Sequence, residues 1–319
     1  MDIHFLGEEE FCEVMNTEEK AWEEACVKQG TLTSFDGCRL NYYTGVPEAP
    51  RGIVVMVHGF CEFWAKYREF AWYLYQAGYG FYFCEHRGFG YSEGKLPEPD
   101  VVYIDDYRTY VEDLHTFIEQ VVKKEQGEKE LLLIGHSMGG CISALFLETY
   151  PGYFKKALLC SPMMKLKGQM SGGKLFAADL YATLFGKKKT LAPGQKRFDG
   201  VNVQATSSSI SKTRYDYQFD LRLADPHYQT SCGSLGWALA SMKAIRRLMK
   251  NAGKIQIPVT LFSAGGEQLL DPAGYDEFKA RVPQTKVLFY ENSKHEIMNA
   301  GDETRIRFFK DVLKELEES

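Results

Sequence analysis

The segment from residue 131 to residue 150, LLLIGHSMGGCISALFLETY, constrains the fold of this chain more than any other stretch. Its first four residues form an apolar run typical of a buried strand, and the residues after 139 are typical of a helix. The chain must therefore turn sharply at Ser137. Gly135 and Gly139 stand two positions before and after this serine, where a sharp strand-to-helix turn requires small residues. The pattern predicts that Ser137 is presented at a sheet edge as a nucleophile.

Short apolar runs alternate with helical patterns through most of the chain. In 106–124 apolar side chains recur every three or four residues, which indicates a helix with one buried face. Apolar runs bounded by Gly, Pro or polar residues are typical of buried parallel strands. Strands that alternate with helices predict an α/β fold with a mostly parallel central sheet flanked by helices, preceded here by an antiparallel hairpin turning at Asp36-Gly37. The expected strands are 53–57, 79–84, 131–134, 157–160, 259–262 and 287–290, and the other expected helices are 67–76 and 139–150.

This alternation fails between residues 163 and 234. The stretch contains several glycines, a lysine run at 187–189 and a serine-rich segment at 206–209, while the apolar residues of 175–185 indicate a short amphipathic helix. A loop of this length without secondary structure is uncommon in a compact domain. We therefore expect an inserted helical cap, or lid, at 163–234. Residues 1–162 and 235–319 would form the N-terminal and C-terminal parts of the core.

Two backbone N–H groups are candidates for an oxyanion hole beside Ser137. The first belongs to Met138, at the start of the predicted helix, where the helix dipole favours negative charge. The second belongs to Phe60, in the loop that follows the expected strand 53–57. Gly59 in that loop lets the backbone come close to a ligand. The neighbouring His58 is expected to be a buried structural histidine.

The general base and its acid partner should come late in the chain, because the order on this kind of fold is serine, acid, histidine. His295 is the only histidine after the last expected strand. Two carboxylates follow the strand 259–262. Glu267 lies nearer the strand end, whereas Asp271 precedes Pro272 and suits a helix N-cap. Glu267 is therefore the favoured acid and Asp271 the alternative.

Three motifs together resemble the monoacylglycerol lipase and lysophospholipase L2-like family. They are Gly-His-Ser-Met-Gly-Gly at 135–140, His-Gly-Phe-Cys-Glu at 58–62 and Glu-His-Arg-Gly-Phe-Gly-Tyr-Ser at 85–92, within a resemblance that runs from about residue 34 to the C-terminus. Glu85 departs from the aspartate usual in that family. The resemblance implies an α/β-hydrolase fold with a helical cap. It also implies that carboxylic esters of single-chain lipids, monoacylglycerol or lysophospholipid, are hydrolysed through an acyl-enzyme on Ser137 without a metal or organic cofactor.

Substrate choice in such an enzyme would depend on the cap. Apolar residues in and next to the cap are candidates for lining an acyl channel. The lysine run at 187–189 is a candidate for meeting anionic headgroups, so the cap is also the expected place of any peripheral membrane contact. The candidate acyl-channel residues are Met163, Met164, Leu175, Phe176, Leu180 and Trp237.

Composition excludes several other classes. The net charge of −5 gives no basic excess, so nucleic acid is not an expected partner. The eight cysteines include no Cys-x-x-Cys pair, which argues against a zinc site. The acidic N-terminus lacks the pattern of a signal peptide, and no apolar run approaches the ~20 residues of a membrane span, so a cytoplasmic protein is expected. The oligomeric state stays open. A general carboxylesterase of broader or short-chain specificity and a non-catalytic ligand-binding member of the fold remain alternative functions.

Overall fold

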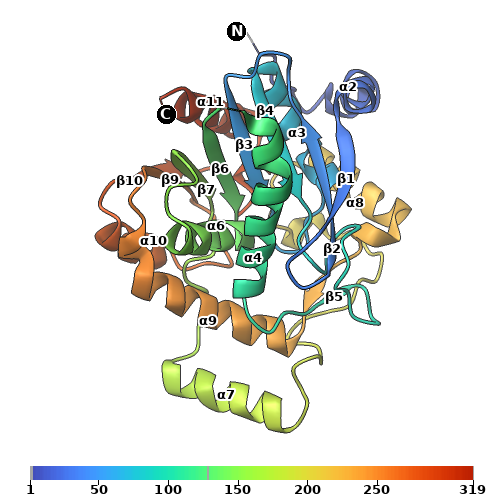
Figure 1. Cartoon of the computed structure of the whole chain (residues 1–319). Coiled ribbons are helices and arrows are strands. Elements are labelled where there is room, and N and C mark those ends of the chain that lie inside the picture. Colours follow the sequence, from blue (N-terminus) through green and yellow to red (C-terminus); the bar gives the residue numbers. More distant parts are fainter. Residues whose placement is uncertain (1–2, 128, 319) are drawn as a thin grey trace.

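The computed structural model describes residues 3–127 and 129–318, and it is built around one eight-stranded sheet (Figure 1). The strand order is β1-β2-β4-β3-β6-β7-β9-β10. Each of the six apolar runs predicted from the sequence lies in one of these strands. Their bounds are β1 Lys28–Thr33, β2 Arg39–Gly45, β3 Gly52–Val57, β4 Tyr79–Cys84, β6 Leu131–His136, β7 Lys156–Cys160, β9 Val259–Ala264 and β10 Thr285–Tyr290.

Six of these strands, from β4 to β10 in sheet order, pair with one another in parallel, and the antiparallel pairings are the two made by β2. β1 pairs with β2 and β2 with β4 in antiparallel fashion, while every pairing from β4 to β10 is parallel. Gly37 turns the β1–β2 hairpin with a φ of +91°, a conformation that glycine adopts without steric cost. Because parallel strands share one direction, the C-terminal ends of β3, β6, β7 and β9 meet at the same sheet edge.

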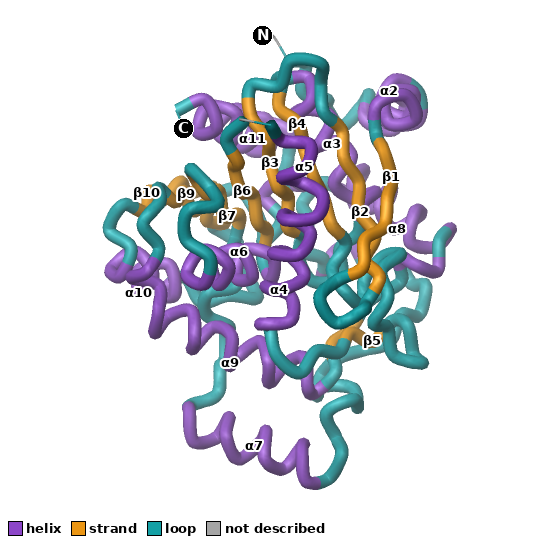
Figure 2. Tube along the Cα trace, in the orientation of Figure 1, coloured by secondary structure: helices purple, strands orange, loops and turns teal. Residues whose placement is uncertain are grey.

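Helices cover both faces of the sheet (Figure 2). In β3, Ile53, Val55 and Val57 belong to one apolar cluster, and Val54 and Met56 belong to the other. The first cluster is completed by α4, α6, α9 and α10, and the second by α3 and α11. Burial on both faces explains why these strands are continuously apolar. The helix bounds are α3 Trp64–Gln76, α4 Arg108–Phe117, α5 Lys123–Gln126, α6 Met138–Thr149, α9 Leu235–Asn251, α10 Ala273–Arg281 and α11 Asp302–Glu317, with a π-helical turn at Ile118–Val122 between α4 and α5.

The stretch 163–234 holds two longer helices, α7 Gly172–Leu184 and α8 Lys212–Ala224. Helix α7 packs on α9 and stands at the lower end of the molecule in Figures 1 and 2. Helix α8, which the sequence patterning did not indicate, packs against the N-terminal helix α1 and against α3. The remaining short elements are β5 Val101–Val102, β8 Cys232–Gly233 and 3-10 turns at Gln204–Thr206, Pro226–Tyr228, Ala252–Lys254 and Ile297–Asn299.

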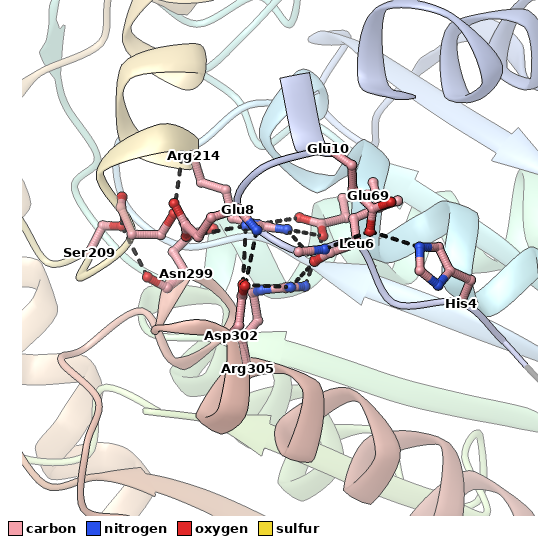
Figure 3. A network of polar contacts seen from close by, with 12 residues as sticks. His4, Leu6, Glu8, Glu10, Glu69, Ser209, Arg214, Asn299, Asp302 and Arg305 are labelled. Atoms are coloured by element: carbon pink, nitrogen blue, oxygen red, sulfur yellow. Dashed lines mark hydrogen bonds and ion pairs between the residues drawn. The ribbon is translucent and has the colours of Figure 1, made fainter. Parts of the chain in front are cut away.

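An N-terminal segment with helices α1 Phe11–Asn16 and α2 Glu18–Cys26 ties α8 to the core. The guanidinium of Arg214 on α8 is fully buried, pairs with Glu69 of α3 at 2.8 Å and donates to the Leu6 carbonyl at 3.0 Å (Figure 3). Arg305 of α11 contacts the same carboxylate at 3.0 Å and the same carbonyl. Four segments far apart in sequence thus meet at one buried network.

No helix within the described residues is long and apolar enough to cross a membrane.

Candidate active site

Ser137 occupies the sharp turn between β6 and α6. Its φ of +51° and ψ of −115° lie outside the regions that L-residues usually adopt. The turn closes only because its neighbours are small. A Cβ on Gly135 would lie 2.5 Å from the Ser143 Oγ, and a Cβ on Gly139 would overlap the carbonyl oxygens of Val57 and His58. The glycine spacing noted in the sequence thus has a direct steric cause.

The structure brings Ser137, His295 and Glu267 together from three separate segments. His295, in the loop between β10 and α11, places its Nε2 2.8 Å from the Ser137 Oγ. Its Nδ1 lies 2.6 Å from Glu267 Oε2. The other Glu267 oxygen, Oε1, accepts the N–H groups of Leu269 at 2.8 Å and Leu270 at 3.3 Å. Each member of the trio is therefore oriented by another member or by the backbone.

Electrostatics keep the Glu267 carboxyl ionised. Burial opposes its ionisation, but the hydrogen bond and charge of His295 and the two backbone N–H groups outweigh burial and hold the pKa of Glu267 below its ordinary value. An ionised Glu267 accepts a proton-bearing Nδ1 from His295, which leaves Nε2 free to accept a proton from Ser137.

Asp271, the alternative acid, lies elsewhere. Its carboxylate forms an ion pair with Lys165 at 2.8 Å and accepts the Ala273 N–H at 3.0 Å at the start of α10. The segment that follows β7 binds the same loop, because the Asp271 N–H donates to the Lys165 carbonyl and the Lys167 N–H donates to the Leu269 carbonyl. The described contacts join His295 to Glu267 and join Asp271 to Lys165.

The two predicted oxyanion donors lie in two separate segments, the start of α6 and the loop after β3. Met138 is the first residue of α6, and Phe60 lies in the loop after β3. Among the described residues, no hydrogen-bond acceptor is paired with the backbone N–H of either. Because a Cβ on Gly139 would overlap the end of β3 and the loop that follows, that loop is in direct backbone contact with the Ser137 turn. In the described structure, neither N–H group is engaged elsewhere, which is what an oxyanion donor requires.

His58 is buried between the sheet and the loop after β4. Its Nε2 accepts the His86 N–H at 2.9 Å and its Nδ1 lies 2.8 Å from the Gly59 carbonyl. Burial lowers the pKa of His58 to about 4, so the ring is neutral near pH 7. These contacts describe a structural histidine.

The candidate acyl-channel residues fall into two groups. Met163 is buried and its N–H donates to the Ser137 carbonyl at 2.9 Å, while the Trp237 ring stacks on the Phe60 ring at a centroid distance of 4.0 Å. By contrast, the α7 residues Phe176 and Leu180 are 70% and 47% exposed. Met164 and Leu175 are buried.

Sequence reasoning missed a buried polar group next to the site. Glu62 is almost fully buried, accepts the Gly59 N–H at 2.5 Å and pairs with Lys66 at 2.8 Å. A Glu and a Lys four residues apart in an otherwise apolar segment are the signal that could have drawn attention to them. No group of three or more His, Cys, Asp or Glu side chains in the described part of the chain is arranged to hold a metal ion.

The mostly parallel sheet, the helices that flank it and the sharp turn at Ser137 define the α/β-hydrolase fold. The model of the family described as serine aminopeptidase, S33, matches residues 48–302, so this chain belongs to that family.

Curated relatives and solved structures agree with this assignment. The chain is 27% identical over 266 residues to a probable lysophospholipase L2 of Haemophilus influenzae, covering 83% of each chain. It is 25% identical over 271 residues to the monoglyceride lipase of Rattus norvegicus, covering 83% of this chain and 82% of the relative. A highly thermostable carboxyl esterase of Bacillus coagulans has the same fold, with a TM-score of 0.75, 18% identity and coverage of 92% and 98%.

Proposed function

We propose that this protein hydrolyses carboxylic esters of single-chain lipids, monoacylglycerols or lysophospholipids, through an acyl-enzyme on Ser137. The observation that carries the proposal is the pair of hydrogen bonds that join Ser137 Oγ to His295 and His295 to Glu267. The substrate class follows from the relatives, which include a probable lysophospholipase and a monoglyceride lipase.

In the proposed reaction, His295 Nε2 takes the Ser137 proton as Oγ attacks the ester carbonyl. The carbonyl oxygen becomes an oxyanion, which the N–H groups of Phe60 and Met138 stabilise. His295, held by Glu267, then gives its proton to the departing alcohol as the ester bond breaks. A water molecule attacks the acyl-enzyme by the same steps and releases the fatty acid, with Ser137 regaining its proton.

The acyl chain would lie against apolar side chains near the serine. Three residues support this placement: Met163, Phe60 and Trp237. The Met163 N–H is hydrogen-bonded to the Ser137 carbonyl, and the Trp237 ring stacks on the ring of Phe60, the proposed oxyanion donor. Phe176 and Leu180 lie on the exposed face of α7 and would meet the lipid outside the catalytic centre.

Two measurements test the proposal. A fluorophosphonate probe should label the wild-type protein and not Ser137→Ala, while Ser143→Ala, buried six residues further along α6, should retain labelling. Absence of labelling in the wild type would favour the non-catalytic alternative.

Across a chain-length series of monoacylglycerols and lysophospholipids, medium or long chains should give the higher kcat/KM. A preference for acetyl esters would favour a general carboxylesterase, and cleavage of aminoacyl anilides alone would favour a peptidase.

We further propose that α7 makes peripheral contact with an anionic lipid surface. Leu175 and Ala182 pack inward against Leu239 of α9, yet the opposite face of α7 is also apolar and exposed. A helix face of this kind beside a lysine run suits the membrane interface. The exposed apolar residues are Phe176, Leu180, Tyr181, Leu184 and Phe185, followed by Lys187, Lys188 and Lys189.

Co-sedimentation with lipid vesicles tests this contact. The double variant Phe176→Ser, Leu184→Ser should lose binding to vesicles that contain phosphatidylserine. Phe289→Ser, which removes a 54% exposed ring from β10, should bind as the wild type does. Equal binding by all three proteins would contradict a role for α7.

A further inference from the structure

Four ionisable side chains form a buried cluster beside the proposed catalytic trio, and the mechanism above uses none of them. They are Glu62, Lys66, His136 and Glu296, called the buried cluster below. Their side chains are 3%, 9%, 6% and 16% exposed. Lys66 Nζ lies 2.8 Å from Glu62 Oε1 and 2.6 Å from Glu296 Oε1, and His136 Nδ1 lies 3.1 Å from Glu62 Oε2. His136 immediately precedes Ser137, and Glu296 immediately follows His295.

Glu62 fixes the loop that carries the Phe60 N–H. Its Oε2 accepts the Gly59 N–H and the Tyr67 hydroxyl, each at 2.5 Å. A Cβ on Gly59 would lie 2.7 Å from the same oxygen, so the loop backbone is in close contact with the carboxylate. Because the Phe60 N–H belongs to the peptide that follows Gly59, anchoring Gly59 restricts the direction in which the Phe60 N–H points.

Lys66 and Glu296 fix the loop that carries His295. Glu296 Oε1 pairs with Lys66, in the first turn of α3, and its Oε2 accepts the Asn299 amide at 2.7 Å. The Glu296 N–H donates to the Ser208 carbonyl of the cap at 3.1 Å. One ammonium group therefore joins the His295 loop to the Phe60 loop.

Stability alone does not account for this arrangement. Moving an ion from water into a protein interior costs several kcal/mol, and well-packed apolar side chains of similar volume often serve stability as well or better. The buried cluster is instead placed where the turn before Ser137, the Phe60 loop and the His295 loop converge. The cluster also lies close to the His295 imidazole, because the centroid of the His136 ring is 5.2 Å from that of the His295 ring.

We propose that Glu62, Lys66 and Glu296 are positioning residues, which hold the Phe60 N–H and the His295 imidazole in the geometry needed at the Ser137 Oγ. This inference rests on the proposed ester hydrolysis. The charged and titratable groups on this side of His295 are Glu62, Lys66, His136 and Glu296, in addition to its partner Glu267.

The test measures kcat, KM and the pH dependence of kcat/KM with p-nitrophenyl butyrate as substrate. It compares two variants, one that removes a positive charge from the buried cluster and one that removes a negative charge. Lys66→Met removes a positive charge and favours protonated His295, so the acid limb of kcat/KM should move to higher pH. Glu296→Gln removes a negative charge, so the same limb should move to lower pH. Both variants should lose kcat by about ten- to hundred-fold with a smaller change in KM, since a displacement of about 1 Å costs that much.

Two further variants separate positioning from folding. Lys66→Arg keeps the charge and the donors and should restore the acid limb to its wild-type position. Lys156→Met removes an equally buried ammonium from the opposite end of the sheet, where it pairs with Glu315, and should lower stability without changing kcat or the pH profile.

Unchanged kcat in Lys66→Met and Glu296→Gln, or acid limbs that move in the same direction, would overturn the inference. So would a loss of kcat in Lys156→Met equal to that in Lys66→Met. If the wild type hydrolyses no ester and Ser137 takes no probe, the proposed function fails first and the inference fails with it. A wild-type enzyme that labels and turns over, with variants that behave as it does, refutes the inference alone.

Discussion

At the scale of single residues, the backbone conformation of Ser137 requires glycine at positions 135 and 139, where a Cβ would overlap neighbouring atoms. Its backbone lies in a sparsely populated region that costs of the order of 1–3 kcal/mol and persists only where surrounding contacts hold it. The Ser137 N–H donates to the Cys160 carbonyl at 3.0 Å, and the Ser137 carbonyl accepts the Met163 N–H at 2.9 Å. The strained backbone of Ser137 is thus held by hydrogen bonds to β7 and to the segment that follows it.

The first prediction concerns Gly139→Ala. The added methyl group overlaps the Val57 and His58 carbonyl oxygens, so the end of β3 must move. We expect a loss of about 1–3 kcal/mol in the free energy of unfolding, as for other overpacked sites, and slower labelling of Ser137 by the fluorophosphonate probe. Urea unfolding and labelling rates measure the two effects.

Gly173→Ala in α7 is the matched control for this prediction. Apart from its chain neighbours and the nearby backbone of α7, no heavy atom of the described residues lies within 4 Å of its added Cβ. Alanine favours a helix by about 1 kcal/mol over glycine. This variant should be as stable as the wild type or more so, with labelling unchanged. Equal destabilisation by both substitutions would show that overlap at Gly139 is not the cause.

At the scale of elements, α8 is held in place by buried charge and not by an apolar face alone. Arg214 stacks over the Phe11 ring at 4.2 Å while it pairs with Glu69. At its N-terminal end, the N–H groups of Ile210 and Ser211 donate to the Asn299 carbonyl, four residues after His295. The N-terminal segment, α8 and the His295 loop therefore form one connected unit, parts of which Figure 3 shows.

The second prediction compares two cations of α8. Arg214→Met should lower the free energy of unfolding by about 3–5 kcal/mol, because the Glu69 carboxylate loses a buried partner. Lys212→Met removes an exposed pair with Asp216 and should cost under about 1 kcal/mol. Urea unfolding of both variants gives the comparison. A similar cost for the two would contradict a structural role for the buried network.

At the scale of the whole molecule, Glu315 of α11 ties three strands to one helix. Its carboxylate pairs with Lys156 of β7 at 2.8 Å and with Lys286 of β10, and accepts the Thr260 hydroxyl of β9 at 2.8 Å. Burial opposes its ionisation, but hydrogen bonds from both lysines and Thr260 lower its pKa from 4.5 to about 2.

The third prediction follows from the sign of this shift. A carboxyl whose pKa is lower in the folded state stabilises the fold above its unfolded pKa, and this contribution is lost as the pH falls through the folded pKa. The stability difference between wild type and Glu315→Gln should therefore be constant above about pH 5 and shrink between about pH 4.5 and pH 2. Denaturant unfolding across this pH range measures it.

Glu277→Gln is the control for the pH effect. It removes an exposed ion pair with Arg281 on α10, so its stability should stay within about 1 kcal/mol of wild type throughout the range. A Glu315→Gln difference that does not change with pH would contradict the assigned lowering of the Glu315 pKa.

The sequence alone determined the features that depend on neighbours along the chain. The turn at Ser137 could be predicted because two glycines at fixed spacing, a preceding apolar run and a following helix pattern all lie within 20 residues. The six apolar strands could be predicted because a strand that is buried on both sheet faces is a continuous run of apolar residues in the sequence. Helix α8 could not, since an ion pair with Glu69 and a hydrogen bond to the Leu6 carbonyl replace the apolar stripe that marks a helix in sequence.

Only the tertiary structure decided which side chains meet across the sheet edge. Glu267 and Asp271 are four residues apart and both follow the same strand, so spacing alone leaves the choice between them open. Lys165, in the segment that follows β7, forms an ion pair with Asp271, while Glu267 is hydrogen-bonded to His295. Glu62, Lys66 and Glu296 lie up to 234 residues apart and form a cluster only in the folded chain. Contacts of this kind leave no local pattern, because they are set by the packing of whole elements.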